Sequence, residues 1–107
     1  MSNLIYEYTL KEILYTIRHK EELEYRAAIT GNMDLLDGII DSEYIIKNAG
    51  LTPKQMQTFS LYYYDDYTLD KIGDMFNTSH QSVADCLTQC KKKIKNYLKR
   101  CYNNDYQ

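Results

Sequence analysis

Hydroxyl, amide and basic side chains follow one another along residues 78–101, in a pattern that suits contact with a phosphate-bearing polymer. Within Cys86–Cys101 there are six basic residues and no acidic one. A local cationic patch of this kind can bind phosphates even on a protein of opposite net charge. The alternative is a solvated helix end whose lysines complement the helix dipole. The six residues are Lys91, Lys92, Lys93, Lys95, Lys99 and Arg100.

The segment 69–88 has the features that a helix-turn-helix needs. Two helices that cross closely require a small residue at the crossing, and Gly73 provides it. The tight turn needs a residue that tolerates the left-handed conformation, for which Asn77 is suited. A small shared core is also required, and an ordinary helical hairpin is the alternative reading. The residues predicted to form that core are Ile72, Phe76, Val83, Cys86 and Leu87.

A helix-turn-helix places the start of its second helix in the major groove of DNA, which identifies candidate base-reading residues. We predict that His80, Gln81, Ala84 and Asp85 face the bases. Gln81 suits an adenine edge, and the methyl group of Ala84 suits a thymine methyl. Asp85 can accept a hydrogen bond from a cytosine amino group but is repelled by phosphates. For His80 and Asp85 the alternative is an exposed side chain without a contact.

Phosphate contacts are expected from two kinds of residue. Hydroxyl groups and backbone N–H groups at helix starts bind phosphate oxygens, and lysines supply the salt-dependent part of the affinity. The predicted phosphate contacts are Thr68, Lys71, Thr78, Ser79, Ser82, Lys91, Lys92 and Lys95.

Five helices account for the chain, so we expect an all-α fold. They are predicted at about residues 3–29, 33–48, 53–64, 69–76 and 80–100. Thr52, Pro53 and Gln55 form the strongest start signal, because they combine an N-cap, a proline in the first helical position and a capping box. Thr68 and Ser79 are expected to cap the last two helices.

Apolar residues at three- and four-residue spacing predict the buried faces. Gly31 and Asn32 separate the first two helices, and Gly50 ends the second. The expected inward residues are Tyr6, Leu10, Ile13, Leu14 and Ile17 in the first helix, Leu36, Ile39, Ile40 and Ile46 in the second, and Met56, Phe59 and Tyr63 in the third.

Composition limits the class of protein. The chain has 107 residues and a net charge of −2, which is unevenly distributed. Residues 1–50 carry five Lys/Arg against nine Asp/Glu, whereas residues 51–107 carry eight against six. No stretch of 18 apolar residues predicts a membrane span, and the N-terminus lacks the basic and apolar regions of a signal peptide. We therefore expect a cytoplasmic protein without membrane contact.

The three cysteines give little support to a metal site or to catalysis. Cys86 and Cys90 lie four residues apart but continue the inward stripe of the last helix, where a thiol behaves as a small hydrophobe. Cys101 is expected to be an exposed free thiol. Neither His19 nor His80 lies in a recognisable catalytic triad context. We expect no metal, no cofactor and no enzymatic activity.

Five segments between residues 51 and 98 form a combination that is known from another protein family. They are 51–55 (LTPKQ), 59–63 (FSLYY), 67–73 (YTLDKIG), 79–83 (SHQSV) and 91–98 (KKKIKNYL). Together they resemble region 4 of bacterial sigma factors, which recognises the −35 promoter element, and the similarity covers nearly half of the chain. The preceding helix at 34–50, running directly into Leu51-Thr52, is similar to that of small sigma-like regulators of phages and prophages in low-GC Gram-positive bacteria.

Two departures from the sigma pattern change what the resemblance implies. The first fifty residues are too short for region 2, which melts the −10 element, so the chain is not expected to initiate transcription alone. Family members often carry basic residues where this chain has Ala84-Asp85 and Thr88-Gln89. We therefore expect weaker or narrower DNA binding than that of a typical region 4, or dependence on a partner.

These observations predict an N-terminal helical arm (1–50), a sigma-region-4-like helix-turn-helix domain (51–101) and a tail (102–107). The expected function is a sequence-specific transcriptional regulator that binds a promoter-like site in double-stranded DNA together with RNA polymerase or a partner subunit. The arm is expected to pack on the DNA-binding domain, form a homodimer or dock another protein. The alternative function is a module that binds RNA polymerase or a sigma factor without reading DNA.

Overall fold

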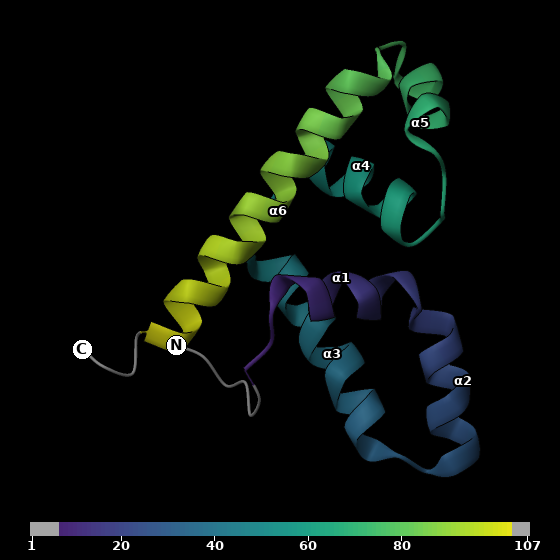
Figure 1. The fold of residues 1–107 in the computed structure, drawn as a ribbon, viewed down its shortest axis with the longest axis vertical. Coiled ribbons are helices and arrows are strands. Elements are labelled where there is room, and N and C mark those ends of the chain that lie inside the picture. Colours follow the sequence, from purple (N-terminus) through teal and green to yellow (C-terminus); the bar gives the residue numbers. More distant parts are fainter. Residues whose placement is uncertain (1–6, 104–107) are drawn as a thin grey trace.

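The computed structural model describes residues 7–103, and these form six α-helices without a strand. The first three helices, α1 (Leu10–Arg18), α2 (Lys20–Thr30) and α3 (Met33–Asn48), make up the arm. The next three, α4 (Pro53–Tyr63), α5 (Leu69–Phe76) and α6 (His80–Asn103), make up the helix-turn-helix half. Helix α6 runs along both halves, with α5 beside its start and α1 and α3 beside its end (Figure 1).

The all-α prediction is confirmed, but the expectation of one helix over residues 3–29 is wrong. Helix α1 begins at Leu10, after a capping box between Thr9 and Glu12, and ends at Arg18. His19 leaves the helical conformation, with φ −108° and ψ 24°, and α2 starts at Lys20. Tyr6 lies outside the described residues. The hydrophobic spacing alone did not indicate this break, because no glycine or proline accompanies it.

Two groups of charged contacts fix the residues on either side of the break to the rest of the protein. Arg18 Nη1 donates to the carbonyl oxygen of Tyr62 at 2.8 Å and lies 2.6 Å from Asp66 Oδ1. Its guanidinium also stacks over the ring of Tyr62, with Cζ 4.6 Å from the ring centroid. Lys20 Nζ lies 2.8 Å from Glu43 Oε2, and the hydrogen bond to Glu43 raises the pKa of Lys20. The break therefore places two cations against α3 and the end of α4.

One hydrophobic core joins the arm to the helix-turn-helix half. Helix α2 packs on α3 and α1, whereas α1 also contacts α4 and α6. The predicted inward residues Ile39, Phe59 and Tyr63 are buried. The buried members of the core are Ile13, Ile17, Ile45, Ile46, Ala49, Phe59, Tyr63, Ile72, Val83, Leu87, Cys90, Ile94 and Leu98.

Two expectations about burial are wrong. Ile40 was predicted to face inward with the other apolar residues of α3, but 62% of its surface is exposed. The buried side of α3 includes Ile39 and Ile46, as predicted, and also Ile45, which the prediction left out. Cys101 was expected to be exposed but is buried, because α6 continues past the predicted end at residue 100 and packs there against the arm.

The predicted start signals of the later helices are confirmed. Thr52 and Gln55 form the capping box of α4, with Pro53 in the first turn. Thr68 Oγ1 accepts from the backbone N–H of Lys71 at 3.1 Å and caps α5. Among residues 7–103, no helix is both long enough and apolar enough to cross a bilayer.

Candidate nucleic-acid interface

The turn between α5 and α6 has the close backbone approach that the sequence predicted. A Cβ atom at Gly73 would lie 2.7 Å from the carbonyl oxygen of Thr78, so only glycine fits without a shift of backbone. The backbone N–H of Thr78 donates to the carbonyl oxygen of Gly73 at 2.8 Å. Asn77 adopts the left-handed conformation, with φ 56° and ψ 49°. The predictions for Gly73 and Asn77 are therefore confirmed.

Hydroxyl groups organise the first turn of α6. Ser79 Oγ accepts from the backbone N–H of Ser82 at 3.1 Å, as expected of an N-cap. The hydroxyl groups of Ser79 and Ser82 also lie 3.1 Å apart and form a hydrogen bond. Thr78, Ser79 and Ser82 are all exposed. The structure thus brings together three of the predicted phosphate contacts beside the start of α6.

The four predicted base-reading residues share the start of α6 but differ in exposure. His80, Gln81 and Asp85 are exposed, whereas Ala84 is half-buried. Gln81 Nε2 donates to Asp85 Oδ1 at 3.0 Å. A bidentate contact with adenine uses both ends of the glutamine amide, so Gln81 would have to release Asp85 to make it. The pair therefore holds the amide in a defined position before any contact forms.

Asp70 of α5 is a neighbour of this surface that the sequence did not indicate. Its Oδ1 lies 3.4 Å from His80 Nδ1, and both side chains are largely exposed. The helical position of Asp70 in the first turn of α5 gave no hint of the contact, because the crossing angle of α5 and α6 decides it. An acidic group consequently lies next to a residue predicted to read bases.

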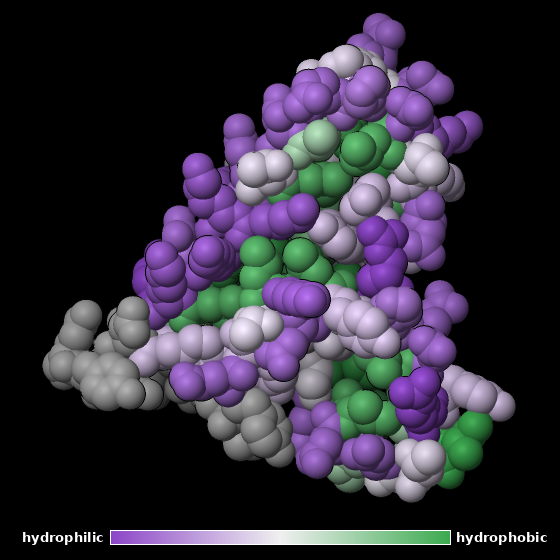
Figure 2. Space-filling model, in the orientation of Figure 1, coloured by the Kyte–Doolittle hydropathy of each residue, from purple (hydrophilic) through white to green (hydrophobic). Residues whose placement is uncertain are grey.

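The lysines continue the same side of α6. Lys92 and Lys95 are exposed, and Lys91 is half-buried. Residues 81, 85, 88, 92, 95 and 99 follow one another at three- and four-residue spacing, so they form one stripe. From Gln81 to Lys95 this stripe is about 21 Å long. Figure 2 shows hydrophilic side chains along the outer side of α6 and hydrophobic ones on its inner side.

Continuation of that stripe adds two candidates that the sequence prediction left out. Thr88 and Lys99 are exposed and occupy the next positions of the same helical repeat. The spacing from Gln81 and Asp85 would have been enough to find them. Thr88 Oγ1 donates to the carbonyl oxygen of Ala84 at 3.0 Å, so its hydroxyl is held against the helix.

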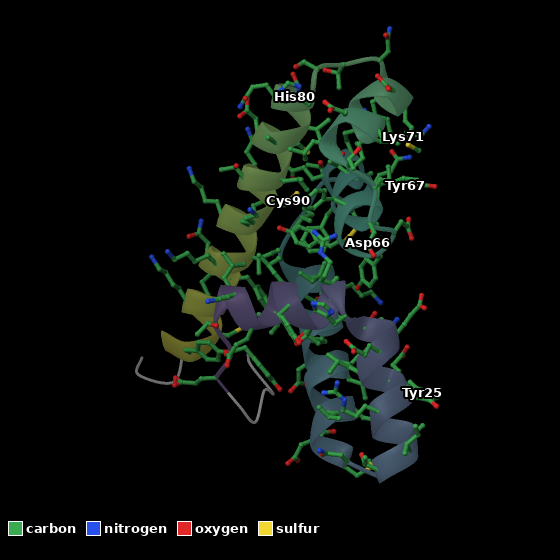
Figure 3. All side chains as sticks on the ribbon, turned by 45° about the vertical axis from the view of Figure 1, so that its right-hand side comes forward. Tyr25, Asp66, Tyr67, Lys71, His80 and Cys90 are labelled. Atoms are coloured by element: carbon green, nitrogen blue, oxygen red, sulfur yellow. The ribbon has the colours of Figure 1, made fainter. Side chains whose placement is uncertain are left out.

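Lys71 is separated from the other candidates. It is exposed in the first turn of α5, and Figure 3 shows it on the side of α5 that faces away from α6. Thr68 caps the same helix. Lys71 therefore does not lie with Ser79 and Ser82, and it could only meet a different part of a DNA backbone.

Two further lysines, Lys93 and Lys54, make contacts that the sequence prediction did not include. Lys93 is turned toward the start of α4, where its Nζ donates to Gln55 Oε1 at 2.7 Å and to the carbonyl oxygen of Gly50 at 3.2 Å. Lys54 lies over the ring of Phe76, with Nζ 4.0 Å from the centroid. Lys54 also lines a shallow groove of about 210 Å³ with Thr78 and Ser82. It is thus a cation close to the turn that the sequence prediction missed.

The cysteines of α6 belong to the core. Cys90 is fully buried and Cys86 partly so. Burial raises the pKa of the Cys90 thiol to about 12, so this group stays protonated at neutral pH. Within residues 7–103, no group of three or more His, Cys, Asp or Glu side chains is arranged to hold a metal ion.

The arm leaves the start of α6 open. Helices α1 and α3 pack beside the end of α6, near the contact of Tyr8 with the hydroxyl group of Tyr102 (Figure 1). The exposed His80–Asp85 surface lies at the other end of the helix, next to α5. Nothing in residues 7–103 blocks its approach to a larger molecule.

Comparisons with known proteins agree with this geometry. The family described as "UPF0122: Putative helix-turn-helix protein, YlxM / p13 like" matches residues 40–106. A UPF0122 protein of Geobacillus sp. (strain WCH70) is 39% identical over 57 residues, which are 53% of this chain and 52% of that protein. A UPF0122 protein of Streptococcus pyogenes serotype M5 is 42% identical over 59 residues, or 54% of this chain and 52% of that protein.

A third relative, from Lactococcus lactis subsp. cremoris (strain MG1363), is 40% identical over 52 residues, or 49% of this chain and 47% of its own length. The chain spans about half the length of the curated relatives it matches. These organisms are low-GC Gram-positive bacteria, the group indicated by the sequence. No solved structure matches the chain. Because the family match covers more than half of the residues, the chain belongs to the YlxM / p13-like family of helix-turn-helix proteins.

Proposed function

We propose that this protein is a sequence-specific DNA-binding transcriptional regulator, in which the start of α6 enters the major groove. The observation that carries the proposal is the exposed polar surface of His80, Gln81 and Asp85, which continues along α6 into exposed lysines. In this assignment residues 51–101 bind DNA and residues 1–50 form the arm. Base contacts come from the start of α6, and phosphate contacts from the turn and from the lysines.

The resemblance to sigma region 4 refines the proposal. A promoter-like site is the expected target, and RNA polymerase or a partner subunit is the expected companion. Weak or narrow DNA binding is expected, because Asp70 and Asp85 lie among the candidate contacts and repel phosphates. Contact with a partner would compensate for the DNA affinity that is lost through the acidic residues around α6.

The salt dependence of binding to a random duplex tests the proposal. We expect the affinity of the wild-type chain to fall steeply as salt rises, since each phosphate contact releases counterions. Replacing the exposed Lys92 and Lys95 with Glu should abolish measurable binding. The matched control replaces Lys11 and Arg26, exposed cations of the arm, with Glu and makes the same change in net charge. Loss of binding in the first variant alone supports the proposal.

A module that binds RNA polymerase or a sigma factor without reading DNA is the second candidate function. The acidic character of residues 65–85, with five Asp against one Lys, favours it. If duplex binding were absent, or insensitive both to salt and to the Lys92 and Lys95 substitutions, this second function would replace the first. Crosslinking of the full chain to purified RNA polymerase would then identify the subunit contacted.

A further inference from the structure

Helix α3 carries a stripe of three exposed residues and the half-buried Asp37 on the side opposite to its buried face. Asp37, Ile40, Tyr44 and Lys47 follow one another at spacings of three, four and three residues, so they share one side of the helix. Ile40 is 62% exposed and Tyr44 is 41% exposed. The buried side of the same helix already contacts α1, α2 and α6. The centre of the stripe, Ile40 and Tyr44, is therefore apolar surface that the rest of residues 7–103 covers only in part.

The charges along the stripe are self-complementary, because an acidic residue lies at one end and a basic residue lies at the same distance from the midpoint at the other end. Asp37 lies five residues before the midpoint between Ile40 and Tyr44, and Lys47 lies five residues after it. In an antiparallel pair of identical helices, each Asp37 would therefore lie opposite a Lys47, and each Ile40 opposite a Tyr44. Such self-complementarity is the property of a two-fold interface. Neither Asp37 nor Lys47 forms an ion pair within residues 7–103.

The apolar surface also continues beyond α3. Tyr44 lies beside Tyr97 of α6, and burial raises the pKa of Tyr97. The guanidinium of Arg100 lies over the ring of Tyr97, with Cζ 5.6 Å from the centroid. A second molecule seated on α3 would thus meet aromatic surface from two helices, with a cation at its edge.

We infer that α3 is a homodimer interface, in which two copies of this chain pack antiparallel through Asp37, Ile40, Tyr44 and Lys47. The occupant is a second copy because its own stripe supplies the complementary charges in the required order. The interface lies away from the α5–α6 turn, so both helix-turn-helix elements remain open (Figure 1). The dimer itself does not depend on DNA binding, whereas its use for reading a two-fold symmetric site rests on the proposed function.

Sedimentation equilibrium of the full chain over a range of concentrations tests the inference without DNA. The stripe is only about 15 Å long, so the dimer is expected to dissociate on dilution. Ile40→Glu should weaken dimerisation by about tenfold or more, because it places two carboxylates at the centre of an apolar contact. Met75→Glu is the matched control, since Met75 is an exposed apolar residue of α5. Circular dichroism of each variant checks that the fold is kept.

Charge exchange tests the antiparallel register. Asp37→Lys and Lys47→Asp should each disfavour self-association, because like charges then face each other. An equal mixture of the two variants should form a heterodimer, and the double variant should dimerise like the wild type. A wild-type chain that stays monomeric at all concentrations would overturn the inference. So would an Ile40→Glu dimer of unchanged strength, or single charge variants that associate as well as the wild type.

Discussion

The helix-turn-helix half and the arm are held together by different means. In the helix-turn-helix half, position is set by neighbours in sequence, through the caps of α4 to α6, the close contact at Gly73 and the left-handed Asn77. In the arm, position is set by contacts across the chain, above all those that Arg18 makes with Tyr62 and Asp66. The arm also leaves several large apolar side chains exposed. The helix-turn-helix half is thus held in one shape by local contacts, whereas the arm has exposed apolar surface that other molecules can bind.

The largest expected effect comes from filling the space at Gly73. Gly73→Ala should lower the free energy of unfolding by about 2–3 kcal/mol, because its Cβ would meet the carbonyl oxygen of Thr78 at 2.7 Å. Gly38→Ala is the matched control in the arm, where a Cβ would meet nothing within 4 Å. That change should stabilise by up to about 1 kcal/mol through helix propensity. Urea denaturation of both variants measures the two free energies of unfolding. Equal changes in the two variants would contradict the special role of Gly73.

Next in size is a test of the left-handed residue. Asn77→Val should lower the free energy of unfolding by about 1–2 kcal/mol, because a β-branched side chain is strained at φ 56°. Asn77→Gly should change it by less than about 0.5 kcal/mol, since glycine adopts this conformation readily. A valine variant as stable as the glycine variant would show that the turn does not depend on this conformation.

The sequence predicted the helix-turn-helix half better than the arm for a physical reason. Caps, glycine at a crossing and an apolar stripe are properties of neighbouring residues, so Thr52, Gly73 and the inner face of α6 could be recognised. The break at His19 and the exposure of Ile40 depend on where distant helices pack. Within the candidate interface, the same limit applied to Asp70 and Lys54, whose positions follow from the crossing of α5 with α6 and from the packing of α4 on α5.

A third test removes the contact that joins the two halves. Arg18→Ala should lower the free energy of unfolding by about 1 kcal/mol, since it loses a hydrogen bond to Tyr62, an ion pair with Asp66 and the stacking on Tyr62. Arg26→Ala is the control, because within residues 7–103 the Arg26 side chain forms only an exposed ion pair with Glu22 of α2. Its effect should stay below about 0.5 kcal/mol. Thermal unfolding of the two variants provides the comparison. Equal decreases in the free energy of unfolding would show that Arg18 does not stabilise the contact between the two halves.

The central claim is that the exposed start of α6 reads DNA, and the sequence preference of Gln81→Ala tests it most directly. Selection from a pool of random duplexes would give the preferred site of the wild type and of the variant under the same salt. We predict that the variant loses preference at one base pair, at a cost of about 1–3 kcal/mol, and keeps the rest. An unchanged preference at every position would contradict the claim.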